Sequence, residues 1–144
     1  MVCLKISARN VLKGTITEVK EGAVNGIVVI DCGCCKPIKA DITLDAIKDL
    51  GLEAGKEAYA IIKASNVMFA AGEDGFPNLS ARNQLKGTVV KVVKGAVNGH
   101  VTVEHKGAKI KGSITNDAID ELGLKEGDPA VAIVKSTDVM VGID

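Results

Sequence analysis

The sequence predicts an all-β protein made of two tandem, small five-stranded barrels, each with one short helix. Two observations carry this prediction: a long internal repeat, and short β-rich runs that recur in the same order in both copies. Residues 7–26 match 80–99 at 14 of 20 positions, and residues 42–71 match 114–143 at 15 of 30 positions. Because a repeat is the strongest architectural signal in a sequence, the chain is interpreted as one fold used twice.

The elements of the first copy follow from hydrophobic alternation and turn residues. Residues 2–7 alternate apolar and polar side chains, as a half-buried strand does, and further β-rich runs predict strands at 13–19, 27–31, 37–42 and 57–63. Residues 43–50 have helical spacing instead, with Thr43 as a cap and Gly51 as a stop. Short strands with one helical turn, closed on themselves, indicate a barrel of the OB type.

Domain boundaries follow from the repeat. We expect a first domain at 1–71, a linker at 72–78 that contains glycine and proline, and a second domain at 79–144. One copy of this size buries a small fraction of its surface and is marginally stable alone. We therefore expect a tight homo-oligomer.

Composition excludes several classes of protein. A hydrophobic content of 47% argues against disorder, and no apolar run approaches the roughly 18–20 residues of a membrane span. The amino-terminal residues do not have the pattern of a signal peptide, which predicts a soluble, intracellular protein without a membrane partner. The 18 basic and 18 acidic residues balance, and aromatics are 2%, so the chain lacks the basic surface and stacking residues of a nucleic-acid binder.

The motif Ser-Ala-Arg-Asn occurs once in each copy and contains the two arginines of the chain, Arg9 and Arg82. It offers a hydroxyl, a guanidinium, an amide and backbone N–H groups, a set that suits a tetrahedral oxyanion. The alternative is structural: the arginine pairs with a neighbouring carboxylate while Ser and Asn form a local turn.

Other candidate donors recur in both copies, and each has a structural alternative. Lys63 and Lys135 end a strand before one or two hydroxyl residues, or are simply solvated strand ends. Thr43 and Thr115 are anion donors or helix caps. The pentapeptide Gly-Ala-Val-Asn-Gly could present a nest of N–H groups to an anion, or connect two strands with glycines that supply positive φ.

The sequence gives little support for a metal site at the cysteines or for catalytic activity. Cys32, Cys34 and Cys35 resemble a soft-metal cluster, but the spacing lacks the usual Cys-x2-Cys pair, so free thiols in a reducing compartment are favoured and no metal site is predicted. His100 and His105 occur only in the second copy. No catalytic motif is present, and the chain is not predicted to be an enzyme.

Several motifs together resemble one family. Ser-Ala-Arg-Asn, Lys-Gly-Thr, Gly-Ala-Val-Asn, Ile-Thr, Leu-Gly-Leu and Val-Met recur in this order, twice, as in the Mop domain, the molybdate-binding module of molbindins. A chain of two such modules resembles a di-Mop molbindin. The resemblance implies an OB-type barrel and a cytoplasmic protein that holds molybdate or tungstate, without a redox cofactor, for storage and homeostasis. It also implies a homotrimer of six modules with oxyanions held between subunits.

The resemblance also implies the site residues. For the main oxyanion site they are Ser7, Ala8, Arg9, Thr43, Lys63, Ala64 and Ser65 in the first copy and Ser80, Ala81, Arg82, Thr115, Lys135, Ser136 and Thr137 in the second. A second oxyanion site near the trimer axis would use the turns Gly22, Ala23, Val24, Asn25 and Gly95, Ala96, Val97, Asn98. Some relatives have a serine three residues after the threonine, where this chain has Ala46 and Ala118. The alternative function is a molybdate-responsive regulatory module that acts through a partner protein.

Overall fold

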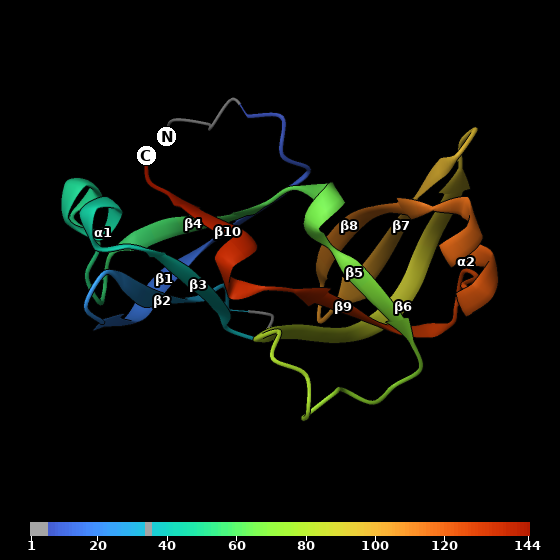
Figure 1. Cartoon of the computed structure of the whole chain (residues 1–144), viewed down its shortest axis with the longest axis horizontal. Helices are drawn as coiled ribbons and strands as arrows, with labels where there is room; N and C mark the ends of the chain where they lie inside the picture. The colour runs from blue at the N-terminus through green and yellow to red at the C-terminus, as the bar shows by residue number, and fades with distance from the viewer. Residues whose placement is uncertain (1–5, 34–35) are drawn as a thin grey trace.

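The chain forms two five-stranded antiparallel sheets that lie side by side, each curled into a barrel (Figure 1). The computed structural model describes residues 6–33 and 36–144. The first barrel contains β1 (Asn10–Glu21), β2 (Asn25–Asp31), β3 (Ile38–Thr43), β4 (Glu57–Ile62) and β10 (Val139–Gly142). The second barrel contains β5 (Met68–Ala71), β6 (Asn83–Lys94), β7 (Asn98–His105), β8 (Ala108–Thr115) and β9 (Pro129–Val134). The predicted all-β architecture of two tandem barrels is confirmed.

The two copies of the repeat exchange their last strands. The strand order is β10-β4-β1-β2-β3 in the first barrel and β5-β9-β6-β7-β8 in the second, so each barrel takes its edge strand from the other copy. In Figure 1, the red β10 crosses into the barrel of the blue strands, and the green β5 crosses into the other. Most of the buried apolar side chains accordingly form one cluster that extends through both barrels, and Ala81, Val131 and Ile133 form a second, smaller cluster. The sequence copies and the structural barrels are therefore different units.

One helix per copy closes each barrel at its outer end. α1 (Leu44–Leu50) begins at Thr43, whose hydroxyl accepts a hydrogen bond from the Ala46 N–H, and ends at Gly51 with φ of 63°. α2 (Asn116–Leu122) has the same cap from Thr115. The helix predicted at 43–50 is confirmed, because both of its end signals are local in the sequence.

The strand predicted at residues 2–7 lies mostly outside the described residues. Of residues 2–7, the first four lie outside the described residues, and Ile6 and Ser7 are not in a strand. The fifth strand of each barrel is instead β5 or β10, which follows a short 3₁₀ helix, η1 (Ala64–Asn66) or η2 (Ser136–Asp138). These strands have four residues each, which is too short to show the alternation that predicts a strand.

Side-chain volumes at the exchanged strands differ between the two barrels. Phe69 on β5 packs onto Gly112 of β8, where an added Cβ would lie 2.6 Å from the ring Cζ and 3.1 Å from the Val67 Cβ. The equivalent positions of the first barrel hold Val141 and Ala40. In the second barrel, the large Phe69 side chain thus lies against a glycine. In the first barrel, the smaller Val141 occupies the position equivalent to Phe69, and Ala40 the position equivalent to Gly112. Because Gly112 leaves room for the Phe69 ring and Ala40 leaves less, this difference favours the placement of β5, and not β10, in the second barrel.

Replacing Gly112 by alanine is expected to destabilise the protein by about 1–3 kcal/mol, because the methyl group overpacks the Phe69 ring. Denaturant unfolding of the full chain measures the loss. In the double variant with Phe69→Val, the smaller side chain makes room for the methyl group, so the combined loss should be less than the sum of the two single losses. Additive losses would show that Phe69 and Gly112 do not constrain each other.

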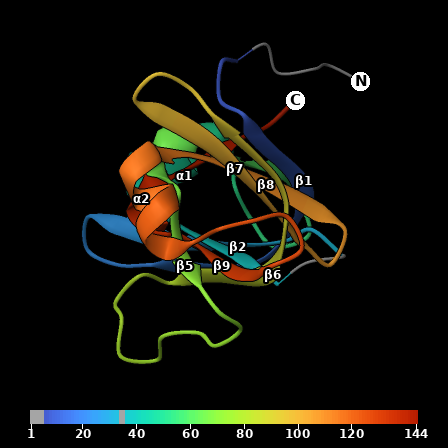
Figure 2. The same ribbon diagram turned by 90° about the vertical axis from the view of Figure 1, so that its right-hand side faces the viewer.

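Side-chain hydrogen bonds attach the linker and the first copy to the second barrel. The predicted linker, 72–78, contains no helix or strand and extends from the barrels as a loop (Figure 2). The Gln84 side chain holds it, since its oxygen accepts from the Phe76 N–H at 2.7 Å and its nitrogen donates to the Phe76 carbonyl at 3.0 Å. The buried His105 ring joins the two copies: its Nε2 accepts from the Lys36 N–H at 3.0 Å, and its Nδ1 contacts the Lys86 carbonyl oxygen at 2.5 Å.

Candidate oxyanion site

Strand pairing brings the arginine motif beside the lysine that ends a strand. β1 pairs with β4 so that Asn10 lies opposite Ile62, which makes Arg9 and Lys63 neighbours at the ends of the two strands. The second copy has the same arrangement, with Asn83 opposite Val134. We call these two regions the Arg–Lys ends; they comprise Ser7–Arg9 with Lys63–Ser65 and Ser80–Arg82 with Lys135–Thr137.

The asparagine of each motif has a structural role. The Asn10 Nδ2 donates to the Lys111 carbonyl at 2.8 Å, and the Lys111 N–H donates to Asn10 Oδ1 at 2.7 Å. Asn83 makes the same pair of bonds to the backbone of Lys39, both at 2.8 Å. Each asparagine is 2% exposed. The amide group, which was a candidate anion donor, therefore joins the two barrels instead. We call these two asparagine side chains with their backbone bonds the asparagine clamp, and each clamp fixes the backbone of the arginine that precedes it.

The charged and hydroxyl groups of the Arg–Lys ends are open to solvent. Arg9, Arg82, Lys63 and Lys135 are all exposed. Within the described part of the chain, the ion pairs join Lys13 to Glu57 and Lys94 to Asp120, and neither arginine is in one. The alternative in which the arginine pairs with a neighbouring carboxylate is thus not realised among these residues.

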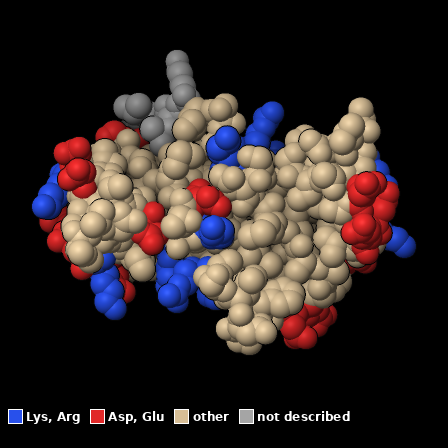
Figure 3. All heavy atoms as spheres, viewed as in Figure 1, with Lys and Arg blue, Asp and Glu red and all other residues tan. Residues whose placement is uncertain are grey.

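Basic residues missed by the sequence analysis surround Arg82. A hollow of about 410 Å³ beneath the linker is lined by Lys36, Lys39, Lys86 and Arg82. In Figure 3, Lys and Arg side chains gather near the junction of the barrels, and acidic ones gather beside α2. An excess of cations in one hollow attracts an anion even though the whole chain is neutral. These lysines are distant in sequence from the motif, so no local pattern connects them with it.

The threonines lie with the Gly-Ala-Val-Asn turns and not with the arginines. Thr43 is opposite Asn25 in the β2–β3 pairing, and the Leu44 N–H donates to the Val24 carbonyl at 2.9 Å. Thr115 is placed in the same way beside the turn at 95–98. Each threonine Oγ1 already accepts a bond at 3.1 Å from the helix, which leaves the hydroxyl proton for an acceptor such as an anion. Cap and anion donor are therefore compatible roles.

The turns themselves are exposed strand connections. The Gly22 N–H donates to the Asn25 carbonyl at 2.8 Å, and Gly95 does the same to Asn98. Val24 at the tip is 75% exposed, and its counterpart Val97 is 71% exposed. The turn glycines do not have positive φ, contrary to the expectation. They are required by close approach, since a Cβ on Gly26 would lie 2.6 Å from Ile47 Cδ1.

The two groups of donors stay apart within one chain. Arg9 precedes β1 and the Gly22 turn follows it, with a strand of 12 residues between them. The other barrel does not bring them together either, because Asn10 holds Lys111, four residues before Thr115, which is about 13 Å of extended strand. Within one chain, the backbone of each arginine motif and that of the threonines are therefore separated.

Outside these groups, the described residues offer no metal centre. Cys32 is half-buried, and Cys3, Cys34 and Cys35 lie outside the described residues. In residues 6–33 and 36–144, no group of three or more His, Cys, Asp or Glu side chains could hold a metal ion. The same part of the chain contains no helix with the length and hydropathy that crossing a membrane requires.

The fold and these sites define a protein of two small β-barrels with exchanged strands and basic, hydroxyl-rich ends suited to anions. The TOBE domain model matches residues 6–69 and 79–141. The chain therefore belongs to the TOBE-domain family, and its two matched segments confirm the tandem Mop architecture that the sequence motifs indicated.

Two relatives of this chain have names that refer to molybdenum. The chain is 40% identical over 141 residues to the molybdenum transport protein ModE of Herbaspirillum seropedicae and 38% identical to the molybdenum-pterin-binding protein MopA of Rhodobacter capsulatus. Each match covers 97% of this chain and 52% or 53% of the relative, so the chain spans about half the length of these curated relatives.

A solved structure matches the whole fold. The cytoplasmic molybdate-binding protein ModG, crystallised with molybdate bound, superposes with a TM-score of 0.92 at 44% identity. The match covers 98% of this chain and 100% of that one. The similarity therefore extends over both barrels.

Proposed function

We propose that this protein binds molybdate or tungstate at its Arg–Lys ends and holds the anions for storage and homeostasis. The observation that carries the proposal is the match to ModG over both full chains, together with a Ser-Ala-Arg and Lys-x-hydroxyl pair at each Arg–Lys end. We place this activity in the cytoplasm, the compartment given for ModG.

The chemistry of the donors supports a tetrahedral dianion. A guanidinium and an ammonium attract the charge through charge-assisted hydrogen bonds, while hydroxyl and backbone N–H donors define the size of the shell. Binding of this kind needs no redox group and no general base, so we propose a binding protein and not an enzyme. Since molybdate and tungstate are close in shape and charge, the site should discriminate poorly between them.

A second copy of the chain would complete the anion shell. Lys111, which holds Asn10, is about 13 Å from Thr115 along β8, and Thr43 lies at the far end of β1 from Arg9. A threonine from a neighbouring subunit can reach the Arg–Lys end without this restriction. We therefore propose that the protein is a homotrimer of six modules with anions held at subunit interfaces, and that the exposed turns at 22–25 and 95–98 form a second set of sites near its axis.

A regulatory role is the second candidate. The chain matches about half of the molybdenum transport protein ModE, which shows that the same tandem module occurs within a longer protein. In that role the loaded module would act through a partner protein. Affinity purification from cells grown with and without molybdate would support it if a partner is retained only with the anion.

Native mass spectrometry of the full chain, with and without molybdate, is expected to show a trimer that takes up several anions per assembly. The reason is that each chain supplies two Arg–Lys ends that need a neighbour's threonine. A monomer that takes up no anion would contradict both the storage role and the shared site. In competition calorimetry, sulfate should bind more weakly than molybdate because it is smaller and fills the shell less well. Equal affinity for the two anions would contradict the proposed shell.

A further inference from the structure

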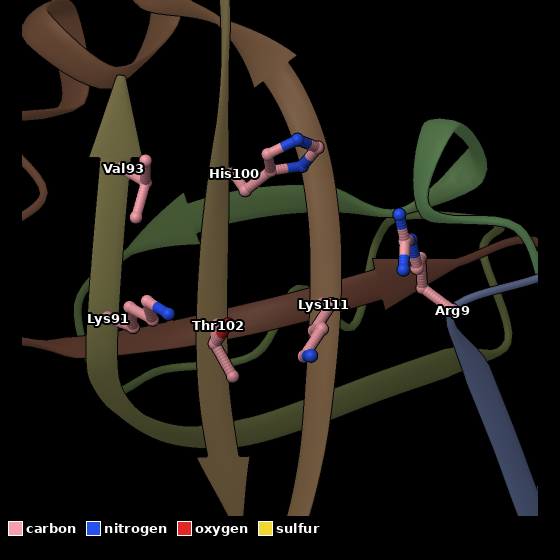
Figure 4. Close-up of a pocket in the computed structure, with 6 residues that line it drawn as sticks. All are labelled: Arg9, Lys91, Val93, His100, Thr102 and Lys111. Atoms are coloured by element: carbon pink, nitrogen blue, oxygen red, sulfur yellow. The ribbon is translucent and has the colours of Figure 1, made fainter. Parts of the chain in front are cut away.

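A second basic hollow lies on the outer face of the second barrel, over β6, β7 and β8. It has a volume of about 270 Å³ and is lined by Arg9, Lys91, Val93, His100, Thr102 and Lys111 (Figure 4). None of the six lining residues is acidic. The volume is near the lower end of the range for small-ligand pockets, about 300 Å³.

Strand register places the charged residues in one row. Lys91 on β6 is opposite Thr102 on β7, and Thr102 is opposite Lys111 on β8. Directly opposite side chains on one face of a sheet lie about 5 Å apart at Cβ, so the threonine stands between two lysines (Figure 4). His100 and Val93 form the next row on the same face.

The other copy of the repeat adds a third permanent cation. Because Asn10 is bonded to both backbone groups of Lys111, the residue before it, Arg9, is held beside this row. Within the described residues, no ion pair neutralises Arg9, Lys91 or Lys111. Like charges gathered without a counter-charge are unfavourable, and a bound anion would relieve the repulsion.

Thr102 gives the hollow a directed donor. The residue is 5% exposed, although it lies on the outer face of the sheet and lines the hollow. Among the residues that the structure describes, none hydrogen-bonds to its hydroxyl. The hydroxyl oxygen is not one of the buried side-chain atoms without a partner, so it remains accessible and can donate its proton to an anion in the hollow.

The equivalent hollow of the first barrel provides an internal comparison. It is lined by Glu18, Lys20, Ile27, Val29, Lys39 and Arg82. Its row is Glu18, Val29 and Lys39, so a carboxylate replaces one lysine and an apolar side chain replaces the threonine. The arginine, the asparagine clamp and the lysine of the third strand are retained, and Lys20 stands where the second barrel has Val93. The differences are that Glu18 offsets one of the cations and that Val29 offers no hydroxyl.

We propose that the hollow of the second barrel binds a tetrahedral dianion, either a free oxyanion such as phosphate or the phosphate group of a small phosphomonoester. Arg9, Lys91 and Lys111 supply the charge, and the Thr102 hydroxyl donates a hydrogen bond. The two halves of the repeat thus differ in function: both have an Arg–Lys end, and only the second barrel has this additional site. Arg9 also belongs to the first Arg–Lys end, so Lys91, Thr102 and Lys111 are what distinguish this hollow from the proposed molybdate site.

The test is an NMR titration of the full chain with inorganic phosphate at constant ionic strength. The amides of Thr102 and His100 should shift to saturation, while those of Val29 and Ile27 should not. Exchanging the row for that of the first barrel, Lys91→Glu with Thr102→Val, should weaken binding at least tenfold. The reciprocal pair, Glu18→Lys with Val29→Thr, should make the first barrel respond. Shifts that do not saturate, or that are equal in both barrels, would overturn the proposal.

Three further measurements make the outcome decisive. Thr102→Ser keeps the hydroxyl and should retain the binding that Thr102→Val loses; equal loss in both would exclude the hydroxyl as a donor. Titration with glycerol 2-phosphate separates the sources of the ligand, since tighter binding than phosphate indicates a phosphomonoester and weaker binding indicates a free oxyanion. The row-exchange variant should take up as many molybdate ions as the unchanged protein; fewer ions would mean that the hollow belongs to the molybdate sites and is not a separate one.

Discussion

Replacing Arg9 and Arg82 together by alanine is expected to reduce molybdate occupancy severely while leaving the oligomer folded. A hydrogen bond to a charged group contributes about 2 kcal/mol, which corresponds to a roughly thirtyfold loss of affinity at each site. Both side chains are exposed and have no ion pair among the described residues, so their removal costs little stability. Calorimetry gives the affinity, and native mass spectrometry gives the occupancy and the oligomeric state.

Two control variants distinguish the contribution of the guanidinium geometry to anion binding from that of positive charge alone. Arg→Lys at both positions keeps the charge but loses the planar fork of the guanidinium, and it should fall between the unchanged protein and the alanine variant. Lys48→Ala removes an exposed positive charge from α1, away from the Arg–Lys ends, and should leave molybdate binding unchanged. If occupancy in the double alanine variant equals that of the unchanged protein, the arginines do not belong to the molybdate site.

Replacing Asn10 by alanine is expected to destabilise the protein by roughly 2–3 kcal/mol, and Asn83→Ala should have a similar effect. Removal of the amide leaves the part-buried backbone N–H and carbonyl of Lys111 without their partner, and it removes the buried bond at 3.2 Å to the Ile62 carbonyl. The free energy of unfolding from denaturant titration measures the loss. Asn78→Ala, an exposed asparagine of the linker, serves as the control and should change stability by less than about 0.5 kcal/mol.

A second substitution tests the direction of the bonds. Asn10→Asp keeps an oxygen for the Lys111 N–H but places the other carboxylate oxygen against the Lys111 and Ile62 carbonyls. A buried charge facing two acceptors should cost at least as much as alanine does. If Asn10→Asp were as stable as the unchanged protein, the asparagine clamp would not depend on the Nδ2 donor. Asn10 would then be a candidate hydrogen-bond donor to the anion.

Much of the fold was predictable because its signals are local. The helix at 43–50 follows from Thr43 and Gly51 alone. The strands predicted at 13–19 and 27–31 lie within β1 and β2, and those at 37–42 and 57–63 match β3 and β4 to within one residue at each end. The repeat predicted the number of barrels. The Arg–Lys end was indicated in part, because the same residue types recur in both copies at matching positions.

The strand exchange and the asparagine clamp were not predictable in this way. β5 and β10 occupy equivalent positions in the two copies, so the sequence pattern alone does not tell which barrel either strand joins. Asn10 and its partner Lys111 are 101 residues apart, so the motif alone indicated an anion as the partner of the amide. Contacts of this range depend on how the barrels pack.

The sequence by itself thus determined the repeat, the local elements and the residue types that suit an oxyanion, because periodicity, caps and turns act over a few residues. Only the tertiary structure decided which donors meet. It separates each arginine from the threonines of its own chain, since they lie at opposite ends of a 12-residue strand or several residues apart along β8. It also makes the two copies unequal, since one row across three strands is Lys91, Thr102 and Lys111 while its counterpart is Glu18, Val29 and Lys39.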